Sequence, residues 1–162
     1  MSKAVIGIDP GKYGAIVGIA NDVVTLQPIP LIGGKVDMVK LYEDFRENIT
    51  FNPEFRNAVV FIEKVGSRPK QKGMFEFGRV VGMLEMLIVC RGFALERVSP
   101  QKWQKILPPF KKGESKKAAL LYVKERYPNF WDAISEEGSY TKKEQEGLID
   151  AFLIAQYGRG QI

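Results

Sequence analysis

The sequence predicts an α/β protein built on a five-stranded mixed sheet with helices on both faces. Five short apolar runs, rich in β-branched residues, are typical of buried strands. Longer segments in which apolar residues recur at helical spacing lie between and after these runs. The resulting order, β-β-β-α-β-α-β-α-α, fits a mixed sheet covered on both sides.

The first three strands follow one another closely, with tight turns between them. They cover residues 3–9, 14–20 and 22–29, with Pro10-Gly11 after the first and Asn21-Asp22 between the other two. Short strands separated by tight turns predict an antiparallel meander.

Helices and strands alternate along the rest of the chain. We expect a helix over 34–50, a strand over 57–63, a long helix over 74–91 and a fifth strand over 93–99. Three more helical patterns cover 103–107, 115–127 and 142–157.

Composition excludes several classes of protein. The chain has 162 residues, about the size of one domain, so we expect a single domain over 1–162. No apolar run is long enough to span a membrane, and the first strand begins at Ala4, so we expect a cytoplasmic protein that is not secreted. Histidine is absent and Cys90 is the one cysteine, which excludes histidine-dependent triads, an internal disulfide and a Cys/His zinc site.

Positive charge is concentrated in two stretches. The formal net charge is +5. Residues 64–72 hold four basic residues and no acid, and residues 97–117 hold seven against Glu114 alone. A single charged run is usually a solvated surface, but two in one small chain favour binding to a polyanion such as nucleic acid.

Four acids occupy positions where carboxylates are costly. Asp9 and Glu63 each end an apolar strand, and Asp150 interrupts the apolar helix pattern with Glu146 one turn before it. Two Mg²⁺ ions would balance four such charges, and a pair of ions is a known device for phosphodiester hydrolysis. Structural alternatives remain: Asp9 as a turn former, Glu63 paired with a nearby base, and Glu146 on a solvated helix face.

Five segments resemble the RuvC family of Holliday-junction resolvases, within the RNase H-like nuclease superfamily. They are Ile6-Gly-Ile-Asp9-Pro-Gly11, Ile62-Glu63-Lys-Val, Phe77-Gly78-Arg-Val-Val-Gly82, Val98-Ser-Pro-Gln-Lys-Trp103 and Asp150-Ala-Phe-Leu-Ile-Ala155. They follow the family order over nearly the whole chain, and the Pro100–Trp103 region is most similar to the phage and organellar branches.

The resemblance implies an RNase H-like sheet, a homodimer, and incision of four-way DNA junctions with Mg²⁺ or Mn²⁺. No membrane and no small-molecule cofactor are implied. Asp9, Glu63 and Asp150 match the metal-binding acids of the family. In bacterial members of the family the last helix carries an Asp-x-x-Asp pair. In this sequence the first aspartate of that pair is replaced by Gly147. Glu146 fits the variant with an acid and a glycine before the final aspartate.

Further residues are candidates for DNA binding and dimerisation. Ser115 is expected to cap a helix whose first turn is basic and suits a phosphate. The long helix holds two glycines at four-residue spacing, which suit either a partner helix or packing on the chain's own sheet. The candidates are Lys64, Arg68, Lys70, Lys72, Lys111, Lys112, Ser115 and Lys116 for DNA, Lys142 and Lys143 for the scissile phosphate, and Gly78, Gly82, Met83 and Met86 for the dimer interface.

Three other functions compete with junction resolution. An RNase H-like nuclease acting on RNA, as in ribosomal-RNA processing, would use the same acids, because phosphate contacts do not identify the sugar. A junction-binding protein without catalysis would leave the acids inert. An actin-like phosphotransferase shares a glycine-rich turn of the type Gly7-Ile-Asp9-Pro-Gly11, but needs two such domains and therefore a longer chain.

Overall fold

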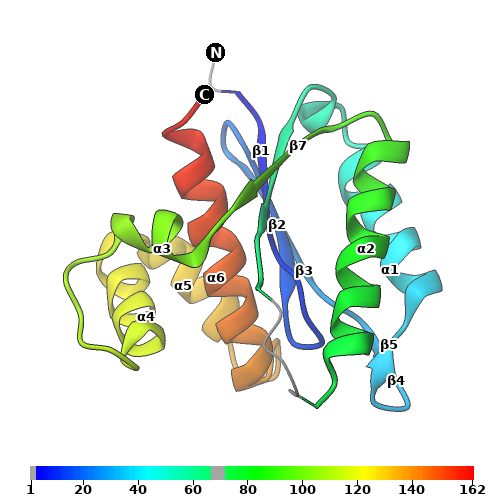
Figure 1. Cartoon of the computed structure of the whole chain (residues 1–162). Coiled ribbons are helices and arrows are strands. Elements are labelled where there is room, and N and C mark those ends of the chain that lie inside the picture. The colour runs from blue at the N-terminus through cyan, green and yellow to red at the C-terminus, as the bar shows by residue number, and fades with distance from the viewer. Residues whose placement is uncertain (1–2, 67–71) are drawn as a thin grey trace.

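The computed structural model describes residues 3–66 and 72–162 and contains the predicted five-stranded sheet (Figure 1). The strand order is β3-β2-β1-β6-β7. The strands are β1 (Val5–Asp9), β2 (Ala15–Ala20), β3 (Val23–Pro28), β6 (Val59–Glu63) and β7 (Ala94–Val98). Strands β1, β2 and β3 form the expected antiparallel meander, and β6 and β7 extend it in parallel from β1, so the sheet is mixed.

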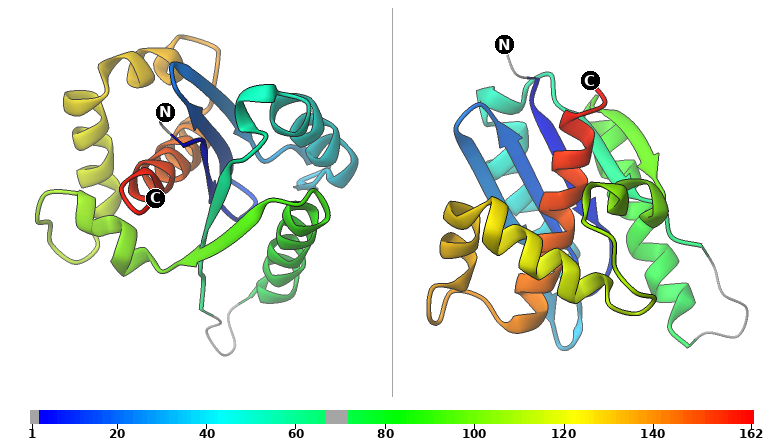
Figure 2. Two further views of the ribbon diagram at one scale, coloured as in Figure 1. Left: turned by 90° about the horizontal axis from the view of Figure 1, so that it is seen from above. Right: turned by 90° about the vertical axis from the view of Figure 1, so that its left-hand side faces the viewer.

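Helices cover both faces of the sheet (Figure 2). One face carries α1 (Met38–Phe45), which continues as a π-helical turn over Arg46–Thr50, and α2 (Met74–Cys90). The other carries α6 (Lys142–Arg159), against which α4 and α5 pack. The remaining helices are α3 (Pro100–Trp103), α4 (Ser115–Arg126) and α5 (Pro128–Ser135), with 3-10 turns at Pro53–Phe55 and Gln104–Ile106.

Helix α6 lies unusually close to β1, and glycine makes this possible. A Cβ atom on Gly7 would lie 2.1 Å from the backbone oxygen of Ala151, and one on Gly147 would lie 2.2 Å from the backbone oxygen of Tyr13. Both distances are far below any van der Waals contact. The two glycines therefore set how near the polar part of α6 comes to the carboxyl end of β1.

Two local expectations were wrong, and one helix was missed. Residues 34–37 do not begin a helix: Gly33 and Gly34, both with positive φ, turn the chain between the short strands β4 (Leu31–Ile32) and β5 (Lys35–Val36). Ser115 is the first residue of α4 and caps nothing, because the preceding Glu114 holds the cap position. Helix α5 was not predicted.

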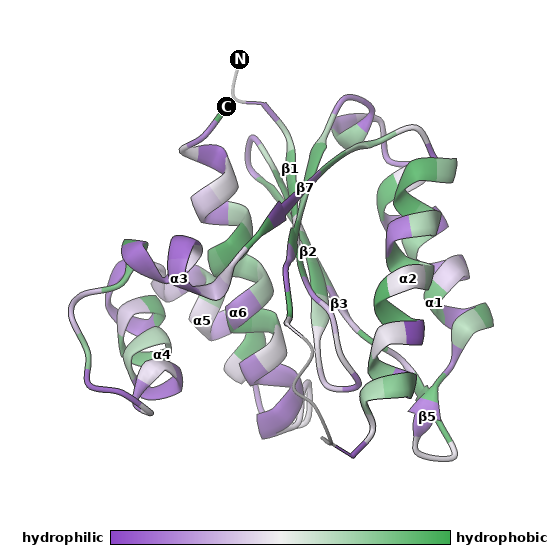
Figure 3. Ribbon diagram, in the orientation of Figure 1, coloured by the Kyte–Doolittle hydropathy of each residue, from purple (hydrophilic) through white to green (hydrophobic). Residues whose placement is uncertain are grey.

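Helix α2 has a buried face and an exposed apolar face. Val80, Leu84 and Ile88 are buried against the sheet. Gly78 and Gly82 are exposed, and a Cβ at either would meet no atom within 4 Å, so the alternative that they pack on the chain's own sheet is wrong. Hydrophobic colouring recurs along much of this helix (Figure 3). Across the described parts of the chain, every helix is too short or too polar to cross a membrane.

Candidate active site

Two of the four acids end neighbouring parallel strands. Ile8 of β1 pairs with Ile62 of β6, so Asp9 and Glu63, the next residue of each strand, lie at the same edge of the sheet. Ile8 and Ile62 point into the core on the side of α1 and α2. Because side chains alternate along a strand, the two carboxylates point to the opposite face, toward α6.

Helix α6 brings the other two acids to this edge. The helix starts at a capping box in which Thr141 Oγ1 accepts from the Glu144 backbone and the Glu144 carboxylate accepts from the Thr141 backbone. Glu146 and Asp150 then lie one turn apart on the same face. With Asp9 they line a hollow of about 300 Å³, whose other walls are Gly11, Tyr13, Gly14, Lys116, Lys143 and Gly147.

Burial raises the proton affinity of three of the carboxylates, and repulsion between carboxylates adds to the effect at Asp9 and Asp150. Burial, aided by the charge of Glu63 and opposed by Lys116, raises the pKa of Asp9 from 3.8 to about 7. Burial also raises the pKa of Asp150 well above its ordinary value, and the charges of Asp9 and Glu63 act in the same direction. The pKa of Glu63 is raised by burial. The charged forms of Asp9, Glu63 and Asp150 are thus destabilised at the same edge of the sheet, which is typical of functional carboxylates.

Two acids at the edges of the cluster have partners. The indole Nε1 of Trp103, which is buried, donates to Glu63 Oε2 at 2.6 Å and works against the rise in the Glu63 pKa. Lys116 reaches across from α4, and its Nζ lies 2.5 Å from Glu146 Oε2. That ion pair is exposed, so it contributes little to stability.

The donor set fits a hard divalent cation. Among the described residues, no three acidic, histidine or cysteine side chains are positioned to hold one ion in common. However, Asp9 and Asp150 form no hydrogen bond or ion pair within the described part of the chain, and both are penalised as bare anions. Carboxylate oxygens in such a setting are the ligands that Mg²⁺ prefers, and Lys116 supplies part of the positive charge that they lack.

Solved structures with a similar arrangement of strands and helices include those of RuvC. Thermus thermophilus RuvC in complex with a Holliday junction substrate is 14% identical, with a TM-score of 0.61 over 98% of this chain and 96% of that one. A second Thermus thermophilus RuvC structure is 15% identical, with a TM-score of 0.59 over the same shares. The chain has the RuvC fold. No protein-family model and no curated protein matches the sequence.

The five-stranded mixed sheet and the likeness to the RuvC structures confirm the predicted fold class. Most of the described residues that were predicted to contact DNA are exposed. Lys64 and Lys72 are exposed, as are Lys111 and Lys112 before α4. Arg68 and Lys70 lie outside the described residues. Lys143 lines the hollow that holds the acids, whereas Lys142 lines a second hollow beside it.

Several side chains around the RuvC-fold site were not predicted to act there. Tyr13 lies at the rim, with the ammonium groups of Lys143 and Lys12 at 4.3 and 5.3 Å from its ring centroid. Trp103 belongs to a matched segment, but its bond to Glu63 spans 40 positions and no spacing rule predicts it. Trp131 stands on α5, where Pro128 at the helix start was a usable signal.

The raised carboxylate pKa values predict an inverted pH dependence of stability in the metal-free protein. Between about pH 4 and pH 7 the folded Asp9 binds a proton that the unfolded one does not, so the free energy of unfolding falls as pH rises. We expect the melting temperature in EDTA to be about 5 °C higher at pH 5 than at pH 8. Asp9→Asn should reduce this difference, and Glu96→Gln, at an exposed acid of β7, should preserve it. Equal melting temperatures for the native chain would contradict the assignment.

Proposed function

We propose that this RuvC-fold chain is a structure-selective DNA endonuclease that resolves four-way junctions by hydrolysing phosphodiester bonds with two Mg²⁺ ions, for which Mn²⁺ substitutes. One observation carries the proposal. Asp9 and Asp150, with raised pKa values and no described partner, meet at the sheet edge beside Glu63 and Glu146. The Thermus thermophilus RuvC bound to a Holliday junction supports junction DNA as the substrate class.

Each acid has a separate task in this proposal. Asp9 and Asp150, which line the same hollow and have raised pKa values, would supply carboxylate oxygens to hold the ions. Glu63 is oriented by Trp103 so that one oxygen remains for binding. The ammonium group of Lys116 is exposed and can turn from Glu146 to the substrate phosphate. This movement would free the Glu146 carboxylate to bind an ion. The bound ions would lower the pKa of the attacking water and stabilise the departing 3′ oxygen.

Trp103→Phe tests the orientation of Glu63. The substitution keeps an aromatic ring in the core and removes the N–H that donates to Glu63 Oε2. Without that donor the Glu63 pKa rises further and its carboxylate is less well ordered. We expect the Mg²⁺ concentration for half-maximal cleavage to rise about tenfold, with activity recovering at saturating Mg²⁺. An unchanged Mg²⁺ dependence would show that the bond is only structural.

Lys111 and Lys112 are proposed to contact the DNA backbone. Both are exposed in the basic segment that leads into α4, next to the lysines that line the two hollows. Substituting either by alanine should lower the slope of log binding constant against log salt by about 0.9, the value for one phosphate. Lys40→Ala is the matched control, because Lys40 pairs with Asp44 on α1. A slope that stays the same in both lysine variants would remove them from the interface.

We also propose that the chain acts as a homodimer through the exposed face of α2. Gly78 and Gly82 leave room for a second backbone, and Met86 beside them is 60% exposed. Met83 is half-buried at the margin of the same face. An apolar stripe of this kind on an otherwise charged surface favours a protein partner. A two-fold dimer would present two sites to a substrate with two equivalent cleavage points.

Cleavage of a synthetic four-way DNA junction in Mg²⁺ tests the function, with a linear duplex and an RNA–DNA hybrid alongside. Paired symmetric nicks in the junction alone are expected. Cleavage of the hybrid, or of RNA, would retain the metal site and move the protein to RNA processing. Tight junction binding without cleavage in Mg²⁺ or Mn²⁺ would support a non-catalytic binding protein.

A further inference from the structure

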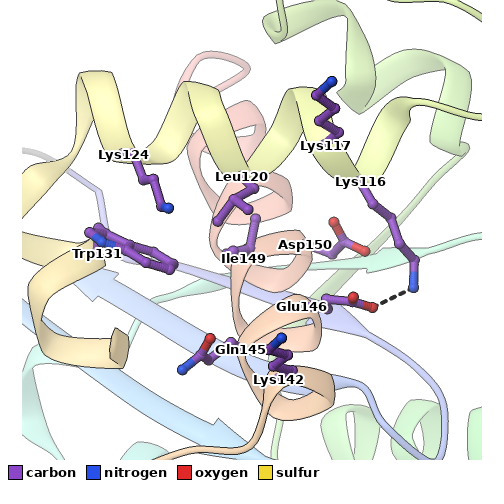
Figure 4. A pocket seen from close by; sticks show the side chains of 10 residues that line it. All are labelled: Lys116, Lys117, Leu120, Lys124, Trp131, Lys142, Gln145, Glu146, Ile149 and Asp150. Carbon is purple, nitrogen blue, oxygen red and sulfur yellow. Dashed lines mark hydrogen bonds and ion pairs between the residues drawn. The ribbon is translucent and has the colours of Figure 1, made fainter. Parts of the chain in front are cut away.

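A second hollow adjoins the acids, and the proposed function does not account for it. It has a volume of about 450 Å³ and lies between α4, α5 and α6 (Figure 4). Lys116, Glu146 and Asp150 line both hollows, so the two lie side by side. If the scissile phosphate of a nucleic acid strand lies at the acids, a neighbouring nucleotide of that strand lies close to this second hollow.

The inner wall of this hollow is apolar and partly aromatic. Leu120 of α4, Ile149 of α6 and Trp131 of α5 face it (Figure 4). Trp131 is only partly buried, although an indole with this much apolar surface is usually covered. Gln145 forms part of the wall, and its Nε2 donates to the Tyr140 backbone oxygen at 3.3 Å, which holds the amide in place. The cavity is of the size that small planar ligands occupy.

The rim of the hollow is positively charged. Lys117 and Lys124 of α4 and Lys142 of α6 join Lys116 there. The Lys124 ammonium lies 4.4 Å from the centroid of the Trp131 ring, so a cation covers the indole in the free protein. Lysines around an aromatic platform are the combination that single-stranded nucleic acid requires, with charge for phosphates and a flat ring for a base.

We infer that this hollow accepts an unpaired nucleobase next to the scissile phosphate, stacked on Trp131. Lys124 leaves the ring when the base arrives and binds a phosphate of the same strand. The inference rests on the proposed function, because it is the acids that fix where the strand lies. It assigns to Trp131 a role in selecting nucleotides that are unstacked, as at the centre of a branched DNA.

Tryptophan emission tests the contact without requiring cleavage. The chain has two tryptophans, and Trp103 is 2% exposed in the core. Titrating the native protein with a four-way junction in EDTA should quench the Trp131 emission. Trp131→Phe should bind the junction with no change in the remaining emission. Equal quenching in both proteins would assign the signal to Trp103 and overturn the inference.

An abasic scan tests the same contact in the reaction. Removing one base at a time beside the mapped nick should lower cleavage by the native protein about tenfold at a single position. Trp131→Ala should cut the intact junction about as slowly as the native protein cuts the sensitive abasic junction. Removing the base at that position should not slow Trp131→Ala any further. Trp131→Phe should retain most of the cleavage activity. Phe51→Ala, at an exposed aromatic beyond α1, should behave as native.

The two failures are distinguishable. If the native protein cuts the junction but the losses from Trp131→Ala and from the abasic position multiply, the nucleobase site is wrong and the proposed function stands. If the native protein neither binds nor cuts the junction, the proposed function is wrong and the inference falls with it.

Discussion

Asp150→Asn is expected to abolish junction cleavage while leaving junction binding intact. Burial raises the pKa of Asp150 well above its ordinary value, and the charges of Asp9 and Glu63 act in the same direction, so its carboxylate needs a cation beside it. Replacing it by a neutral amide of the same shape removes that need and the metal affinity together. We expect cleavage in Mg²⁺ to fall by about 10³-fold.

The same variant should be folded and somewhat more stable than the native chain in EDTA. The native carboxylate is penalised by burial, and the amide carries no charge to bury. Asp132→Asn, at an exposed acid of α5, is the matched control and should cut normally. Normal cleavage by Asp150→Asn would show that the acids do not bind the catalytic ions.

Gly147→Ala is expected to have the largest effect on stability at the site. Its Cβ would lie 2.2 Å from the Tyr13 backbone oxygen and 3.1 Å from Gly14 Cα, and backbone atoms cannot rotate aside. Helix α6 would have to move away from the turn after β1. We expect a loss of about 2–3 kcal/mol in the free energy of unfolding, and a fall of about 5–10 °C in melting temperature.

Gly78→Ala provides the contrast for that measurement. Gly78 is also inside a helix, but a Cβ there meets no atom within 4 Å. Measured on the monomer, at a protein concentration too low for the proposed dimer to form, alanine should therefore stabilise the fold by about 0.5–1 kcal/mol. If Gly147→Ala were equally harmless, the close approach of α6 to the β1–β2 turn would be wrong.

The contact at Gly147 also explains the position of the fourth acid. An Asp-x-x-Asp pair would require a side chain at 147, where the Tyr13 carbonyl leaves no room. Glu146 lies one residue earlier, at the rim of the hollow, and its longer side chain is exposed enough to pair with Lys116. Gly147→Asp should therefore destabilise the protein and should not restore a bacterial-type site.

The strands and the long helices could be predicted because their signals are local. Runs such as 3–9 and 57–63 are β-branched and end in an acid, and both appear as strands of the central sheet. The helix expected over 34–50 exists but begins at Met38, so only its start was wrong. Its apolar spacing was followed back to residue 34 although Gly33-Gly34 is a pair that favours a hairpin turn. Proline at the start of a helix was likewise overlooked at α5.

The site could be predicted only in part. The acids stood out because carboxylates at strand ends and in an apolar helix are costly, a property of each residue and its immediate neighbours. The bond from Trp103 to Glu63 and the ion pair from Lys116 to Glu146 span 40 and 30 positions. They depend on how α3 and α4 dock, and so does the hollow beside Trp131. No periodicity in the sequence encodes that docking.

Calorimetric titration of Mn²⁺ into the DNA-free protein at pH 7 tests the central claim most directly. The native chain is expected to bind two ions and to release protons as they bind, since the pKa of Asp9 is about 7. The double variant Asp9→Asn with Asp150→Asn should bind neither ion at this site. Identical titration curves for the native chain and the double variant would contradict the account.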